Sequence, residues 1–467
     1  MRHPPKFFIT HEGTTGVFRA TEDAAVLHHR QLFGAALPRA AMGHRKFDFF
    51  TVQASVEIFF AYFRHLAQKT RTAPYYIFNV RNIELGKYVS TSVLRDVETN
   101  ANPAKFAFAF HIALLRACFV YGAALRSRDT AGAISLGDAF YLDGIWIDFF
   151  LAEEGPIVYL SIHPYGQLCI RGQFSNLTSL LKRLAEIRRQ EQFLGSKAVS
   201  EYMKKRLEDP KSKIFYYTAK DDSFNLPTNL GSTEKKVVIY AHSFTDSQME
   251  AGFDGFKSVY DWLIFTVRVL SNRSQPVSLF LKAHPSFFNT SSERSAERLD
   301  KRLWDSLVAT LPLGVHVVSS SVTNAQFLSK FDPAETIVIS HHGNAIVEAA
   351  YLGFTSISSI ASPWGEEYCF SETWSNREEY AKLLGAVTEP RKIGDKEKFE
   401  VEKFISDVYL NASVSITEDT YLLNVISRHC ATPVDVLRLD PFAALNVNSE
   451  GMTGLVAELS SNVKMLA

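Results

Sequence analysis

The chain has 467 residues, too many for one ordinary hydrophobic core, and this length predicts two domains. Hydrophobic residues make up 46% of the chain and charged residues 21%, as in soluble globular proteins. Lys and Arg number 50, as do Asp and Glu, so the formal net charge is zero, which argues against a general attraction to nucleic acid.

Cysteine usage and the N-terminus favour a cytoplasmic protein. Cys118, Cys169, Cys369 and Cys430 are far apart and form no CxxC pair, so we expect neither a structural zinc site nor a disulfide framework. Such a pattern fits a reducing compartment. The first residues lack the apolar core of a signal peptide. We therefore expect the protein in the cytoplasm.

The first half of the chain is predicted to be an α/β domain. Helical spacing and β-branched apolar runs predict helices at residues 47–67, 106–125, 141–153 and 177–207, and strands at 75–80, 133–138 and 156–162. Strands that alternate with helices indicate a parallel sheet. The most apolar stretch, 106–125, contains His111 and Arg116, which favour a buried amphipathic helix over a membrane span.

The second half repeats the alternation after a polar segment at 221–235, which contains Pro and Gly and is the best linker in the chain. Expected strands are 236–241, 277–282, 315–318, 336–340 and 355–360, and expected helices are 256–270, 295–309, 324–330, 344–352, 389–409 and 419–429. This rhythm is typical of a doubly wound nucleotide-binding domain. The predicted domains are 1–225, 236–385 and a helical tail 386–467 that packs back on the first.

Polar residues follow several of these strands, where ligands bind in doubly wound sheets. After the strand 236–240, His242, Ser243, Thr245 and Asp246 could hold a sugar or move protons. The alternative is an ordinary Asx or Ser/Thr turn. The next strand ends in Lys282 and His284, alternate residues that project on one face and suit a phosphate.

The most specific pattern follows the strand 336–340. Gly343 lets the backbone approach a ligand closely, and the N–H groups at the start of the helix at Asn344 could bind an anion. Glu348 lies one turn further, where its carboxylate could accept both hydroxyls of a ribose. The alternative is an ordinary helix start with a surface glutamate. His342, beside the glycine, belongs to the same candidate site.

Two further segments carry candidates. Ser320 and Thr323 could touch the phosphate or the base of a nucleotide, although capping the next helix is the simpler role. In the first half, Asp138 follows a predicted strand and could be a base or an acceptor ligand, or equally a helix cap.

Taken in order, these motifs resemble the capsule-polysaccharide and lipopolysaccharide biosynthesis transferases, including the Kdo-transferase-like group. The resemblance covers roughly residues 134–384. It rests on Gly137-Asp138-x2-Tyr141-x2-Gly144, His242-x-Phe244-x-Asp246, Asp261-Trp262, Lys282-x-His284-Pro285, His342-Gly343-x4-Glu348, Pro363-Trp364-Gly365 and Ser375-Asn-Arg377-Glu378-Glu379-Tyr380. The chain departs from the common pattern at Asn344, where Thr or Ser often follows the glycine, and at Ser247, where Ala often follows the aspartate.

The resemblance implies a GT-B fold, in which two Rossmann-like doubly wound domains face a central cleft. It implies a glycosyltransferase that uses a nucleotide-sugar donor, of which CMP-Kdo is one example, and a glycan or glycolipid acceptor. Such an enzyme could associate peripherally with the inner face of the membrane. Neither a metal nor a cofactor is expected, and no nucleic acid partner. Lys282 and His284 would neutralise the departing phosphate, and Glu348 would hold the ribose. Asp138 or Asp246 would activate the acceptor or bind the donor sugar.

Three other functions stay open on the same residues. A teichoic-acid-type polymerase, which transfers a phosphoalditol from a CDP donor, shares the Lys-x-His-Pro element. A nucleotide-sugar epimerase would use the same fold without an acceptor. A non-catalytic subunit of a polysaccharide complex would have the same shape and no turnover.

Overall fold

The computed structural model describes residues 6–11, 14–19, 48–68, 74–94, 102–126, 133–136, 144–145, 148–149, 157–160, 167–170, 193–208, 224–227, 235–245, 248, 252–274, 277–288, 295–385 and 390–410. The chain divides into two compact units. The first unit comprises Met1–Val93, Phe108–Leu184 and Asn411–Ala467, and the second comprises Leu94–Ala107 and Ala185–Leu410. The domain boundaries expected from the sequence stay predictions.

A six-stranded parallel sheet forms the centre of the second unit, so the α/β prediction for this half is confirmed. Its order is β11-β10-β9-β6-β7-β8. The strands are β6 (Lys236–Tyr240), β7 (Ser278–Lys282), β8 (Val315–Val318), β9 (Thr336–Ser340), β10 (Thr355–Ser359) and β11 (Glu372–Trp374). The chain starts at β6, winds outward to β8, then returns to β9 on the other side of β6. The point where the winding reverses therefore lies between β6 and β9.

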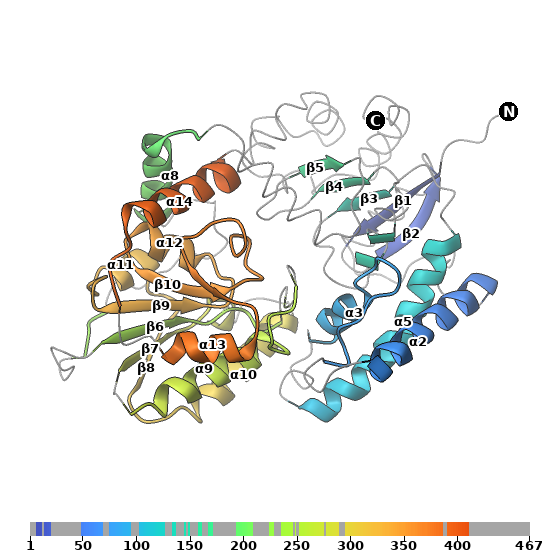
Figure 1. Ribbon diagram of the computed structural model, residues 1–467, viewed down its shortest axis with the longest axis horizontal. Coiled ribbons are helices and arrows are strands. Elements are labelled where there is room, and N and C mark those ends of the chain that lie inside the picture. Colours follow the sequence, from blue (N-terminus) through green and yellow to red (C-terminus); the bar gives the residue numbers. More distant parts are fainter. Residues whose placement is uncertain are drawn as a thin grey trace. The chain divides into compact units, whose positions relative to one another are not determined.

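Helices cover both faces of this sheet (Figure 1). One face carries α9 (Val259–Ser271), α10 (Ser295–Val308) and α13 (Arg377–Gly385). The other carries α8 (Ser196–Glu208), α11 (Asn324–Leu328), α12 (Ala345–Tyr351) and α14 (Asp395–Phe404). A short 3₁₀ helix, η2 (Pro285–Phe288), follows β7, and a π-helical turn, η3 (Ile405–Leu410), follows α14.

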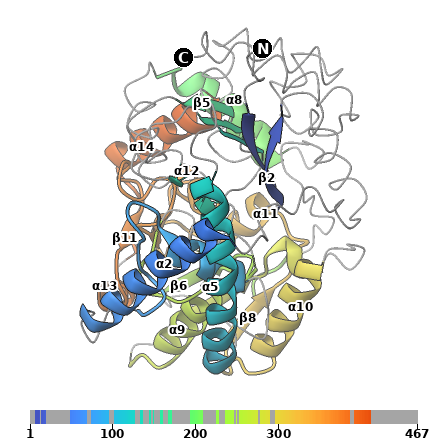
Figure 2. The ribbon, with the colours of Figure 1, turned by 90° about the vertical axis from the view of Figure 1, so that its right-hand side faces the viewer.

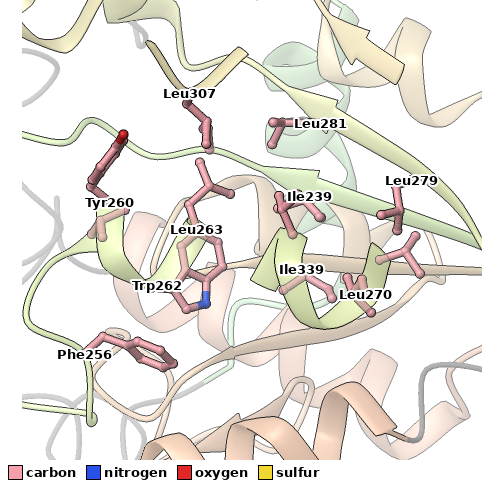
Figure 3. Close-up of a cluster of buried hydrophobic side chains, with 14 of the residues drawn as sticks. Ile239, Phe256, Tyr260, Trp262, Leu263, Leu270, Leu279, Leu281, Leu307 and Ile339 are labelled. Carbon is pink, nitrogen blue, oxygen red and sulfur yellow. The ribbon is translucent and has the colours of Figure 1, made fainter. Parts of the chain in front are cut away.

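Alternate residues of the central strands enter two separate cores. In β6, Val237 and Ile239 join the core beneath α9, whereas Val238 and Tyr240 join the opposite core. Burial on both faces favours apolar residues at consecutive positions, which explains the β-branched run of β6. Figure 3 shows the first core, where Trp262 and Leu263 of α9 meet the strand side chains. Burying each such large side chain stabilises the fold by about 1.5–3 kcal/mol.

The first unit contains a mixed five-stranded sheet in the order β2-β1-β3-β4-β5. The strands are β1 (Lys6–His11), β2 (Thr14–Arg19), β3 (Ala133–Leu136), β4 (Ile157–Leu160) and β5 (Gln167–Ile170). β1, β3 and β4 are parallel, but β2 and β5 are antiparallel to their neighbours. The prediction of a parallel sheet here is therefore wrong for both edges. The links β1–β2 and β4–β5 are too short for a crossover, so these strands can only return antiparallel.

Three helices of the N-terminal half are α2 (Phe49–Gln68), α3 (Leu85–Leu94) and α5 (Pro103–Arg126). Figure 2 shows α2 and α5 side by side, and the hydroxyl of Tyr62 lies 3.1 Å from Nε2 of His111 between them. The expected strand at 75–80 is wrong, because this segment forms turns and a single bridge from Val80 to Ile83. Its residues Tyr76, Phe78 and Val80 are buried although the segment pairs with no strand. A short apolar run does not by itself distinguish a buried strand from a buried irregular segment.

The other expected helices and the linker are described by the structure only in part. Within the described residues, α5 is the single helix long and apolar enough to cross a membrane. Of its apolar 18-residue stretch, 61% is buried inside the protein. Of the helix expected at 177–207, the structure describes residues 193–207. The helix α8 begins only at Ser196, and the expectation is wrong for 193–195, where Gly195 has φ of 90°. Most of 141–153, the segment 419–429 and most of the linker lie outside the described residues.

Candidate functional site

Three histidines meet at the reversal point of the second unit's sheet. His242 follows β6, His284 follows β7 and His342 follows β9. The ring centroids of His242 and His342 are 4.0 Å apart, and those of His242 and His284 are 5.4 Å apart. We call these side chains the imidazole cluster. Its position at the carboxyl ends of adjacent parallel strands is where doubly wound sheets bind ligands.

Lys282 ends β7 beside this cluster. The side chain is buried, and its Nζ donates a long hydrogen bond of 3.5 Å to the carbonyl oxygen of Ser319. Burial lowers the pKa of Lys282 to about 8, although the charge of Glu348 acts in the opposite direction. A buried ammonium with such a weak partner is costly unless an anion approaches it. Lys282 therefore gives the site an affinity for negative charge.

Two rings of the imidazole cluster, those of His284 and His342, are uncharged at neutral pH. Burial lowers the pKa of His284 well below its ordinary value, and the charges of His242 and Lys282 lower it further. The pKa of His342 is lowered in the same way, by burial first and then by the neighbouring histidines. The Nδ1 of His242 lies 3.2 Å from the carbonyl oxygen of Ser243, so this nitrogen carries a proton and donates it.

The turn after β9 brings backbone close to these rings. A Cβ added to Gly343 would lie 2.9 Å from Oγ of Ser340, which would have to move, and in ordinary contact with Cδ2 of His242 at 3.7 Å. Asn344 caps α12 without a side-chain hydrogen bond to the helix. Instead, its Oδ1 accepts a 2.8 Å hydrogen bond from the hydroxyl of Tyr409. The predicted anion contacts of this turn stay predictions.

Glu348 lies on α12, and protein groups occupy both of its carboxylate oxygens. Arg206 donates to Oε1 at 2.7 Å, and Asn324 donates to Oε2 at 2.6 Å. Both side chains of the ion pair are nearly inaccessible to water. A carboxylate can accept further hydrogen bonds, so the predicted ribose contact is still open. The geometry shows that Glu348 also holds α8 against α12.

The other predicted residues fall into two groups. Thr323 is the N-cap of α11 and accepts a 3.2 Å hydrogen bond from the backbone N–H of Gln326, so it performs the capping role. Ser320 is half-buried in the turn before this helix. Asp138 and Asp246, the two candidates for acceptor activation, lie outside the described residues.

The sequence reasoning missed a buried network behind the imidazole cluster. Nε2 of His341 lies 2.9 Å from Oδ2 of Asp254, and Nδ1 of His341 lies 2.6 Å from Nδ1 of His342. The same Oδ2 accepts a 2.5 Å hydrogen bond from Ser359, and Oδ1 accepts one from the N–H of Phe256 at 3.3 Å. Two consecutive histidines after a buried strand were the available signal. Asp254 had none, because only the fold brings it to them.

Asp254 is ionised in this network. Burial would raise its pKa, but the electrostatic attraction of its partner His341 and the hydrogen bonds from His341, Ser359 and Phe256 hold the pKa below its ordinary value. Among the residues described, no group of three His, Cys, Asp or Glu has the arrangement of a metal site.

No protein-family model matches the sequence, and no curated protein is significantly similar to it.

Proposed function

We propose that this protein is a glycosyltransferase that binds a nucleotide-sugar donor at the imidazole cluster. The observation that carries the proposal is the convergence of His242, Lys282 and His284 with His342 at the reversal point of a six-stranded parallel sheet. A diphosphate or phosphodiester placed there would meet a buried ammonium and several imidazole rings. The geometry of the site supports nucleotide binding. Sugar transfer is supported by the order of the motifs along the chain, which resembles the order in surface-polysaccharide transferases.

The chemistry requires negative charge to grow on the phosphate as the sugar leaves. Lys282 is buried, so its ammonium acts through a medium of low dielectric and stabilises that charge more strongly than it would in water. His284 would donate a hydrogen bond to the same phosphate, and Glu348 would accept the ribose hydroxyls. In this proposal Asp138 or Asp246 activates the acceptor or binds the donor sugar, and the acceptor is a glycan or glycolipid bound by a second Rossmann-like domain of a GT-B fold.

The test is incubation with a panel of CMP, CDP, UDP and GDP sugars, with detection of the free nucleotide. Release that depends on an added glycan acceptor is expected of a transferase. Release without acceptor would identify a hydrolysing epimerase, and transfer from a CDP-alditol would identify a polymerase of the teichoic-acid type. Absence of nucleotide binding would overturn the proposal in favour of a non-catalytic subunit.

His284→Ala checks the assigned site. We expect the acceptor-dependent turnover to fall about ten-fold or more, because a transition-state contact is lost. His316→Ala is the matched control, since His316 stacks on Phe280 in the same sheet, with ring centroids 5.0 Å apart, and belongs to no part of the proposed site. Equal turnover in the two variants would remove His284 from the active site.

A further inference from the structure

A continuous line of hydrogen bonds leads from a buried carboxylate to the centre of the imidazole cluster. It passes from Asp254 through His341 to His342. At its far end, Nε2 of His342 is buried and has no hydrogen-bond partner among the residues that the structure describes. A buried polar atom without a partner is rare, and at a ligand site it indicates a contact that the ligand completes.

Packing holds the middle of this line in place. His341 is only 4% exposed, and its ring makes edge contacts with Trp262 at 5.5 Å and with Trp374 at 5.9 Å between centroids. Both of its nitrogens are engaged, one by Asp254 and the other by His342. The ring therefore has no freedom to flip without breaking two hydrogen bonds.

The positions of the protons follow from the partners. The carboxylate of Asp254 can only accept, so Nε2 of His341 must carry a proton. When the line holds no additional proton, Nδ1 of His341 has a lone pair, and the proton in the 2.6 Å contact belongs to Nδ1 of His342. The neutral ring of His342 then has no proton left for Nε2, which is a bare acceptor.

We propose that Asp254 and His341 are positioning residues that set His342 as the proton acceptor of this site, through Nε2. The inference rests on the proposed transferase function for the identity of the proton donor, which is the attacking hydroxyl of the glycan acceptor. It leaves Asp138 or Asp246 the other proposed role, which is binding of the donor sugar. The order of protons in the resting protein does not depend on that function.

The proton transfer balances within these three residues. As the hydroxyl oxygen forms its bond to the sugar, its proton moves to Nε2 of His342, and the bond from the sugar to the phosphate breaks. The proton on Nδ1 of His342 then moves to Nδ1 of His341. The resulting imidazolium of His341 is paired with the carboxylate of Asp254, which stabilises the charge where it comes to rest.

Asp254→Asn should reverse the positions of the protons on His341 and His342. The backbone N–H of Phe256 can only donate, so the amide oxygen of the new side chain must face it, and the NH₂ group must face His341. His341 would then accept at Nε2, donate from Nδ1, and force the proton of His342 onto Nε2. The variant removes the acceptor from the imidazole cluster without changing a residue within it.

The experiment is NMR of protein labelled with ¹⁵N-histidine, in which protonated and bare ring nitrogens have distinct shifts, with His342→Gln to assign the signals. We expect the proton of His342 on Nδ1 in the wild type and on Nε2 in Asp254→Asn. A proton on Nε2 of the wild-type His342, or an unchanged tautomer in the variant, would overturn the inference. The wild-type spectrum decides the question alone if the variant does not fold.

Asp300→Asn is the matched control. Asp300 is also a buried carboxylate that accepts from a serine hydroxyl and a backbone N–H, those of Ser243 and Phe244, at 2.6 and 3.0 Å. Its amide should leave both tautomers of His341 and His342 unchanged. A change as large as that of Asp254→Asn would show that any loss of buried charge shifts the protons, and would overturn the specific role of Asp254.

Kinetics separate this inference from the function on which it rests. In the transfer assay, Asp254→Asn should lower kcat about 100-fold, the scale of general base catalysis, with KM for the donor nearly unchanged. An unchanged kcat would overturn the proton-accepting role. If the NMR gives the expected tautomers but no nucleotide sugar is turned over, the proposed function fails and the order of protons stands.

Discussion

At the residue scale, Lys282 shows a conflict between stability and ligand binding. Its side chain is 3% exposed, and burial holds its pKa at about 8, below the ordinary value of about 10.4. The folded protein therefore carries this ammonium at neutral pH at a free-energy cost that an unfolded chain avoids. A cost of this kind is common where binding needs a charge that folding does not.

Lys282→Met should expose that cost. Between pH 8 and about 10.4 the unfolded chain binds more protons at this residue than the folded protein, so the free energy of unfolding of the wild type rises across this window. At about pH 7 we expect the variant to be more stable by about 1–3 kcal/mol, and this advantage to shrink at about pH 10. Urea unfolding at both values measures it. A variant that is equally destabilised at both would show that the buried ammonium carries no such cost.

At the scale of single elements, the loop between β6 and α9 depends on a close backbone contact. Gly255 has φ of 98°, and a Cβ there would lie 2.6 Å from the backbone nitrogen of Arg377 at the start of α13. This loop also carries Asp254, so the glycine helps to bring the carboxylate to His341. Neither strain in φ nor the missing space can be relieved by a side-chain rotation.

Gly255→Ala and Gly314→Ala form a matched pair. Gly314 has φ of 93°, but nothing lies within 4 Å of its added Cβ. We expect Gly314→Ala to cost about 1 kcal/mol of backbone strain, and Gly255→Ala to cost at least about 1 kcal/mol more because backbone atoms must move apart. Chemical denaturation of both variants measures the difference. Equal losses of stability would show that the loop relaxes around the new methyl group without cost.

At the scale of the whole molecule, the division into two compact units suggests separate unfolding steps. His242, Lys282, His284 and His342 all belong to the second unit, so a bound nucleotide should stabilise that unit directly. Four of the five tryptophans also belong to it, and all four are buried, which makes tryptophan fluorescence a report on this unit.

We therefore expect calorimetry to resolve two thermal transitions. The change in tryptophan fluorescence should coincide with the transition of the second unit. A nucleotide that binds the imidazole cluster should raise the Tm of that transition and leave the other in place, and the shift should be smaller in Lys282→Met. A single transition that coincides in calorimetry and fluorescence would show that the two units unfold together.

Much of the second unit could be predicted from the sequence because its signals are local. The strand Thr336–Ser340 is buried on both faces and has consecutive apolar residues at 337–339, and the helix after it shows its own period. The same rule failed at residues 75–80, where buried aromatic side chains lie on turns. No strand was predicted at β1, β2 or β5. The expected parallel sheet is also antiparallel at both edges, because strand direction depends on the length of the link rather than on the strand residues.

The sequence by itself determined the alternation of strands and helices in the second half and the polar residues that follow each strand. Only the tertiary structure decided that β9 lies beside β6, which brings His342 to His242, and that Asp254 reaches His341. The physical reason is range. Local periodicity and turn chemistry act over a few residues, whereas strand order and the partner of a buried carboxylate are set by packing between segments that are distant along the chain.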